Sequence, residues 1–251
     1  MRESLYARLA AATGLVFVAS IATVAIIGQA KDLKLAGDLA LRGGNEVFGW
    51  TTLLTGVGAI ALFWFASTFA ARIRRLEGGS GRLATTVAVS GAFIAGTLAL
   101  GISVAYAARS ANSVGLGALT TAIYAGPGLF FPAAVFVGAG SIVGLRHREE
   151  LPIYGRVLAM LSAPLALAYI GGAGLMLFKN YAWINDTGYI TFLAFTLALS
   201  VIGIVRWGEM DMRPAEPEVE EPPAEVVPHP RARRPVPAAT TRTASARRRA
   251  V

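Results

Sequence analysis

The chain has 251 residues, of which 55% are apolar and only 15% charged, and its formal net charge is +8. Soluble globular domains carry about 25% charged residues, so this composition favours an integral membrane protein over a soluble one. The absence of cysteine excludes disulfide bonds, thiolate metal sites and a cysteine nucleophile. Basic residues comprise twenty arginines and three lysines. Together with abundant Ala, Gly and Val, this preference for arginine over lysine indicates a GC-rich bacterial genome, because GC-rich codons favour these residues.

Six apolar runs are long enough to cross a hydrocarbon core about 30 Å thick, which takes roughly 20 helical residues. They lie near Leu9–Ala30, Val47–Ala71, Leu83–Ala108, Gly117–Leu145, Leu151–Phe178 and Tyr189–Trp207. Each run is continuously apolar, whereas the strands of a membrane barrel alternate over about 10 residues. The expected fold class is therefore all-α: a polytopic transmembrane bundle of six helices over residues 1–208.

The first run also has features of a secretory signal. Arg2 and Arg8 precede it, and Gly28-Gln29-Ala30 is similar to a cleavage site. Its apolar stretch, residues 9–27, is longer than the 7–15 residues of a usual signal core, which favours a retained helix. Cleavage is the alternative, and it leaves five helices in the same orientation.

Lysine and arginine near the ends of the runs predict the orientation, because short cytoplasmic segments are enriched in them. One side carries Arg2, Arg8, Arg72, Arg74, Arg75, Arg82, Arg146, Arg148, Arg156, Arg206 and Arg213, and the other carries Lys31, Lys34, Arg42, Arg109 and Lys179. The excess of eleven over five predicts a multi-pass protein of the bacterial inner (cell) membrane with both termini in the cytoplasm.

The composition changes at Glu209. Seven acidic residues interleaved with prolines are followed by seven arginines, with few large apolar residues between them. Such a segment cannot bury enough apolar surface to offset the entropy of ordering, so residues 209–251 are expected to form a disordered cytoplasmic tail.

The basic end of this tail is the candidate contact with a partner. A merely solvated tail is the simpler interpretation. The alternatives are contact with anionic lipid or a protein through Arg231, Arg233, Arg234, Arg247, Arg248 and Arg249, or electrostatic folding of this basic end onto the acidic half of the tail. Nucleic acid is disfavoured, because no aromatic residue or folded module accompanies the arginines.

The fourth run contains two prolines and two glycines near its middle, and it provides the candidate ligand or kink region. This region comprises Tyr124, Gly126, Pro127, Gly128 and Pro132. Proline removes a backbone donor, so the helix is expected to kink or break there, with carbonyl groups freed near residues 123 and 128. The hydroxyls of Tyr124, Thr120 and Thr121 are possible partners for these carbonyls. Broken helices form substrate sites in many transporters, but proline kinks also serve packing alone.

Ionisable residues lie at the ends of the runs: Glu46, Arg109, Arg156 and Asp186. Interfacial anchoring is the simpler interpretation, and a Glu46–Arg109 or Asp186–Arg109 pair over an external vestibule is the alternative. The shortage of buried carboxylates disfavours a proton-coupled carrier.

Three further patterns have modest interpretations. Gly140 and Gly144 have the spacing of a close helix contact, either within the bundle or in a homo-oligomer. The two histidines, His147 and His229, lack metal-ligand spacing, and neither nucleotide-binding nor hydrolase motifs are present, so no metal or other cofactor is expected. Asn185-Asp186-Thr187 matches a glycosylation sequon by chance.

Residues 63–92, FWFASTFAARIRRLEGGSGRLATTVAVSGA, carry a resemblance. An arginine-rich helix end followed by Glu77-Gly78-Gly79-x-Gly81-x-Leu83 resembles a pattern in uncharacterised six-helix membrane proteins common in high-GC Gram-positive bacteria. The resemblance implies a six-helix fold. That family has no known activity, so it implies no catalytic residue.

These patterns together predict a non-enzymatic membrane protein with a structural, regulatory or partner-binding role. A transporter or channel for a small neutral or lipophilic molecule, built on the broken fourth helix, is the alternative.

Overall fold

The computed structural model describes residues 2–33, 36–77, 81–125, 127–147, 153–178 and 182–210. All regular structure within these ranges is helical, which confirms the all-α class. The elements are α1 (Arg2–Ala30), α2 (Ala36–Arg42), α3 (Asn45–Glu77), α4 (Arg82–Ser110), α5 (Val114–Ala125), the 3₁₀ helix η1 (Pro127–Leu129), α6 (Phe130–Arg146), α7 (Ile153–Phe178) and α8 (Ala182–Met210).

Five of these helices, α1, α3, α4, α7 and α8, are long and apolar enough to cross a membrane. The fourth apolar run differs from the others because it forms two shorter helices, α5 and α6, joined through η1. The predicted interruption of this run is therefore a complete break. One element, the short helix α2 between the first and second runs, was not predicted.

Helix α8 begins at Ala182, well before the expected start at Tyr189. The polar residues that precede Tyr189 in the sequence are accommodated within the helix. The Thr187 hydroxyl donates to the carbonyl of Trp183 at 2.9 Å, and Thr191 donates to the carbonyl of Thr187 at 2.9 Å. Its other end, Met210, lies just beyond the expected start of the tail, and residues 211–251 lie outside the described part of the chain.

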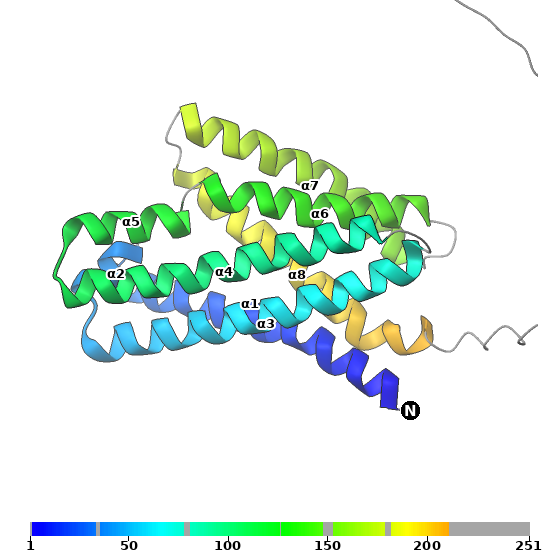
Figure 1. The fold of residues 1–251 in the computed structure, drawn as a ribbon, viewed down its shortest axis with the longest axis horizontal. Helices are drawn as coiled ribbons and strands as arrows, with labels where there is room; N and C mark the ends of the chain where they lie inside the picture. The colour runs from blue at the N-terminus through cyan, green and yellow to red at the C-terminus, as the bar shows by residue number, and fades with distance from the viewer. Residues whose placement is uncertain are drawn as a thin grey trace, which may run out of the picture. The chain divides into compact units, whose positions relative to one another are not determined.

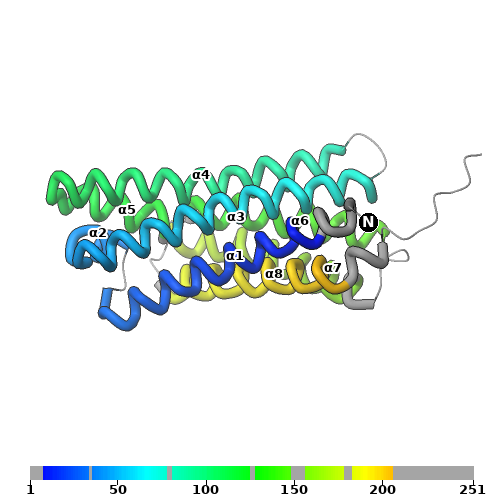
Figure 2. The backbone as a smooth tube through the Cα atoms, turned by 90° about the horizontal axis from the view of Figure 1, so that it is seen from below, coloured from blue at the N-terminus to red at the C-terminus, as the bar shows by residue number. Residues whose placement is uncertain are grey.

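Consecutive long helices run antiparallel to one another (Figure 1). Helix α3 packs between α1 and α4, and α8 returns beside α1. Helices α5 and α6 follow each other along α4, and α7 packs mainly on α6. The start of α1 and the end of α8 lie at one end of this helical unit (Figure 1), and α2 lies at the other (Figure 2).

A chain of phenylalanine rings connects four helices across the core. The ring of Phe69 in α3 lies 5.6 Å from that of Phe136 in α6, measured between centroids. Phe136 in turn lies 6.0 Å from Phe192 in α8, which lies 6.2 Å from Phe17 in α1. Contacts of this kind hold a bundle together through close packing, because apolar burial gives little drive in lipid.

The turn between α3 and α4 explains part of the Glu-Gly-Gly-x-Gly-x-Leu pattern. The Glu77 carboxylate accepts hydrogen bonds from the backbone N–H groups of Leu83 at 3.1 Å and Ala84 at 3.2 Å, which caps the start of α4. Gly81 has a φ of 64°, and a β-carbon there would lie 3.1 Å from the Arg74 side chain. The glycines at 78 and 79 lie outside the described residues.

Candidate functional site

The candidate region from the sequence spans the break between α5 and α6, and its residue Gly126 lies outside the described residues. Pro127 opens η1, and Gly128 is exposed, with open space where a β-carbon would point. Pro132 is the third residue of α6. A backbone N–H at that position has no acceptor within the helix, so proline is tolerated there. The expectation that Pro132 interrupts a helix is therefore wrong, because the break lies before it.

Two aromatic side chains hold the break, one on each side, and each is seated on a glycine of another helix. A β-carbon on Gly101 of α4 would lie 2.3 Å from the ring of Tyr124, the penultimate residue of α5. A β-carbon on Gly188 of α8 would lie 2.4 Å from the ring of Phe130, the first residue of α6. Any side chain at either glycine would displace the ring, so both sites require a glycine for this packing.

The carbonyl group of Tyr124, in the last turn of α5, accepts a hydrogen bond from the Tyr189 hydroxyl of α8. The hydroxyls suggested by the sequence bond elsewhere, so that expectation is wrong. Tyr124 donates to the carbonyl of Leu98 at 3.1 Å, and Thr120 donates to that of Leu116 at 2.9 Å. Tyr189 lies 65 residues from Tyr124 in the chain, and no local pattern connects them.

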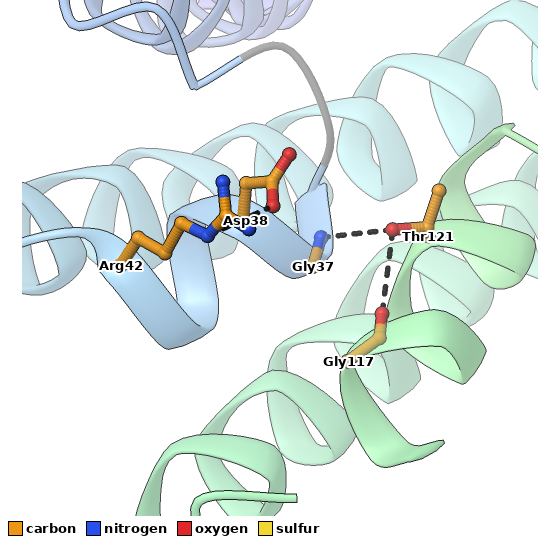
Figure 3. A network of polar contacts seen from close by, with 5 residues as sticks. All are labelled: Gly37, Asp38, Arg42, Gly117 and Thr121. Carbon is orange, nitrogen blue, oxygen red and sulfur yellow. Dashed lines mark hydrogen bonds and ion pairs between the residues drawn. The ribbon is translucent and has the colours of Figure 1, made fainter. Parts of the chain in front are cut away.

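Thr121 instead connects α5 to α2 (Figure 3). Its hydroxyl accepts a hydrogen bond from the backbone N–H of Gly37 at 2.9 Å and donates to the carbonyl of Gly117 at 3.3 Å. A β-carbon on Gly37 would lie 2.3 Å from that carbonyl oxygen, so the two backbones touch. On the same short helix, Asp38 and Arg42 form an ion pair at 3.7 Å. The Gly37 N–H thus anchors α2 to α5, whereas the Asp38–Arg42 pair lies within α2.

A cavity of about 40 Å³ lies beside the break. Five helices and η1 line it, through Phe17, Ile21, Ile94, Leu98, Leu129, Phe130, Ala133, Tyr169, Gly188, Tyr189 and Phe192. The sequence predicted the helix break, and two of the lining residues, Leu129 and Phe130, lie at this break. It carried no signal for the lining residues of the other helices, because they meet only in the folded bundle.

The lining of this cavity is apolar even though two tyrosines contribute to it. The Tyr169 hydroxyl bonds to the carbonyl of Gly188 at 3.1 Å and to the Thr191 hydroxyl at 3.0 Å. The Tyr189 hydroxyl bonds to the Tyr124 carbonyl, as described above. With its tyrosine hydroxyls bonded to protein groups, such a cavity suits an apolar group better than water, which needs two to four polar partners.

Arg109 has a structural role at the α2 end of the unit. Its guanidinium donates to the carbonyls of Ala40 at 3.0 Å and Gly43 at 2.7 Å and to the Asn45 side chain at 2.6 Å. It also lies 4.7 Å from the centre of the Phe48 ring. Among the described residues it pairs with neither Glu46 nor Asp186, so the alternative of a Glu46–Arg109 or Asp186–Arg109 pair is wrong.

Gly140 and Gly144 pack within the bundle. A β-carbon on Gly140 would lie 3.3 Å from the Phe69 ring of α3, and Gly144 is buried. Gly140 therefore takes part in a close helix contact within the bundle.

The described residues contain no group of three or more His, Cys, Asp or Glu side chains that could hold a metal ion. Comparison of the chain with protein-family models, curated proteins and solved structures gives no match. The resemblance of residues 63–92 therefore stays an expectation, and the site is interpreted from its own geometry.

Proposed function

We propose that this chain is a six-span protein of a bacterial inner membrane that binds an apolar molecule, or the apolar part of a larger one, without catalysing a reaction. The cavity at the break is the observation that carries the proposal. It lies in the core of the bundle, and its two tyrosine hydroxyls are already bonded to protein groups. No acid, base or nucleophile therefore faces a ligand there. Ligand binding fits a regulatory or partner-binding role.

The six spans include α5 and α6 as one interrupted crossing. These helices have 12 and 17 residues, or about 18 and 26 Å at 1.5 Å per residue, and neither alone spans a core of about 30 Å. Their end-to-end arrangement along α4 supports a single crossing (Figure 1). An even number of crossings agrees with the start of α1 and the end of α8 lying at the same end.

The orientation follows from the arginine excess, and we propose cytoplasmic termini. Alkaline phosphatase fused after Val251 is expected to be inactive, and a fusion at Asn112, between α4 and α5, to be active. The opposite pattern of activities contradicts the orientation.

Filling the cavity tests the binding function. Ala133 lines the cavity and is 7% exposed, so Ala133→Leu places extra atoms in it. Val135→Leu is the matched control, because Val135 lies on the same helix and is 44% exposed. Both variants and the wild type are extracted in native nanodiscs, and their bound lipophilic molecules are compared by mass spectrometry. We expect Ala133→Leu alone to lose a specific molecule. Identical profiles for all three proteins would contradict the proposal.

A transporter is the second candidate, favoured by the broken fourth crossing. Two short helices joined at mid-crossing form substrate sites in known transporters. Transport requires the cavity to open to each side in turn. Cysteine substitution of Leu98 and Ala133, followed by labelling from either side of sealed vesicles, distinguishes the two roles. Labelling from both sides favours transport, and labelling from one side or neither favours binding alone.

The tail is proposed as a contact for anionic lipid or a protein, through the six arginines named in the sequence analysis. Removal of residues 212–251 is expected to leave the thermal stability of the helical unit in detergent unchanged, because the tail composition offers no core. Binding to vesicles that contain anionic lipid is expected to fall in the same truncated protein. A large drop in the melting temperature contradicts the first expectation, and unchanged vesicle binding contradicts the second.

A further inference from the structure

Two polar atoms of α8, Asn185 Oδ1 and Thr196 Oγ1, are buried and have no hydrogen-bond partner among the described residues. The other serine and threonine hydroxyls of the same helix are satisfied by the backbone one turn earlier. Ser200, for example, donates to the carbonyl of Thr196 at 2.7 Å. The amide oxygen of Asn185 cannot solve the problem in this way, since it is an acceptor only.

Asn185 lies on the face of α8 that lines the cavity. The lining residues Gly188, Tyr189 and Phe192 follow it by three, four and seven positions. At about 100° per residue, these positions fall within about 60° of Asn185 around the helix. Phe192 is about 10 Å further along the axis, at 1.5 Å per residue. A buried acceptor therefore lies on the same side of α8 as the apolar cavity, about one turn before it.

Asn185 is also close to the membrane interface in the proposed arrangement. The apolar part of α8 that can cross a membrane begins at Trp183, whose side chain is 64% exposed. Tryptophan is enriched at the level of the lipid head groups. Along α8, an interfacial tryptophan is thus followed by a buried hydrogen-bond acceptor and then by the apolar cavity. A single-chain amphiphile has the matching order, with a polar head followed by an apolar chain.

We propose that the cavity and Asn185 together form a site for a single-chain amphiphile. The far end of its apolar chain enters the cavity, and a hydroxyl or amide N–H at its head donates to Asn185 Oδ1. This assignment rests on the proposed binding function and adds the class of ligand. A buried acceptor without a donor is costly, so a ligand that supplies the donor is favoured over one that does not.

The test compares two photoreactive probes on the full-length protein in nanodiscs: octanol carrying a diazirine, and its methyl ether. The two probes share the apolar chain, and only the alcohol has a donor. After irradiation and digestion, mass spectrometry quantifies labelling of the peptides that contain residues 129–133 and 188–192. We expect saturable labelling of both peptides by the alcohol, with an apparent affinity about tenfold above that of the ether.

Three variants separate the parts of the proposal. Asn185→Leu removes the acceptor and is expected to abolish the preference for the alcohol while labelling by the ether persists. Ala133→Leu fills the cavity and is expected to abolish saturable labelling by both probes. Asp186→Asn, at an exposed neighbouring position, is expected to behave like the wild type. Thermal melting of each variant in detergent checks its folding.

The outcomes distinguish the two claims. Equal affinities of the wild type for alcohol and ether, or an alcohol preference that survives in Asn185→Leu, overturns the amphiphile assignment and leaves apolar binding standing. The first of these comparisons needs no variant, so it holds even if Asn185→Leu fails to fold. Absence of saturable labelling of the wild type by either probe overturns the binding function as well.

Discussion

The α3–α4 turn and the break between α5 and α6 both interrupt the helical path near glycines. They differ in which part of the chain supplies the hydrogen-bond partners of their free backbone groups. At the turn, the Glu77 side chain caps N–H groups six and seven residues later. At the break, the carbonyl of Tyr124 is capped by Tyr189, which is 65 residues away. The turn is thus completed locally, whereas the break depends on another helix.

This difference shows where tertiary structure is required. In the proposed membrane arrangement, the turn lies at the surface, where water reaches its polar groups, so a local cap adds stability without being essential. The Tyr124 carbonyl at the break lies at membrane depth in that arrangement, where an unpaired carbonyl is costly. The break persists because Tyr124, Phe130 and Tyr189 fix it against neighbouring helices.

The largest effect on the break is expected from Gly188→Ala. The added β-carbon would lie 2.4 Å from the Phe130 ring and would force it away from α8. Overpacking of this kind costs about 1–3 kcal/mol, and we place this substitution at the upper end. Gly174→Ala in α7, where no atom lies within 4 Å, is the control, and it is expected to stabilise the protein by about 0.4–1 kcal/mol, as Gly→Ala in a helix does. Reversible unfolding in detergent measures both, and equal stabilities would contradict the seating of Phe130.

Tyr189→Phe keeps the ring and removes the hydroxyl that caps the break. The Tyr124 carbonyl then stays buried without its donor, which is expected to cost about 2 kcal/mol. Tyr106→Phe, at a 65% exposed position in α4, is the control. The same unfolding measurement applies. A loss no greater than that of the control would show that the hydrogen bond does not hold the break.

Glu77→Ala removes the local cap of α4 and is expected to destabilise the protein, as loss of a helix cap commonly does. Water can replace the carboxylate at this turn, so the effect should be smaller than that of Tyr189→Phe. Glu46→Ala, at the exposed start of α3, is the control. A reversed order of the two losses would break the comparison between turn and break.

Pro127→Ala is expected to have the smallest effect, below about 0.5 kcal/mol, because the aromatic residues on each side hold the break without the proline. Hydrogen exchange of the backbone amides of residues 128–130 reports whether a continuous helix re-forms. Strong new protection there would show that Pro127 alone causes the break.

Hydropathy predicted the apolar runs well, because long apolar segments have few alternatives in a membrane protein. Proline and glycine predicted the interruption at Pro127, because both residues disfavour a helix through their own backbone geometry. Helix α2 was missed because its seven residues are too few to show a clear period, and Thr121 of a distant helix caps its first turn. Tyr189 and the cavity lining were unpredictable, since they depend on which helices become neighbours.

The Tyr124–Tyr189 hydrogen bond has a consequence for biosynthesis. The chain emerges N-terminus first, so α5, η1 and α6 are made before the helix that completes them. Until α8 arrives, Tyr124 lacks the hydroxyl that caps its carbonyl, and Phe130 lacks Gly188 as its seat. The interrupted crossing therefore reaches its final form only with the last helix, and a chain arrested before Ala182 would present an incomplete bundle to the quality-control proteases of the membrane.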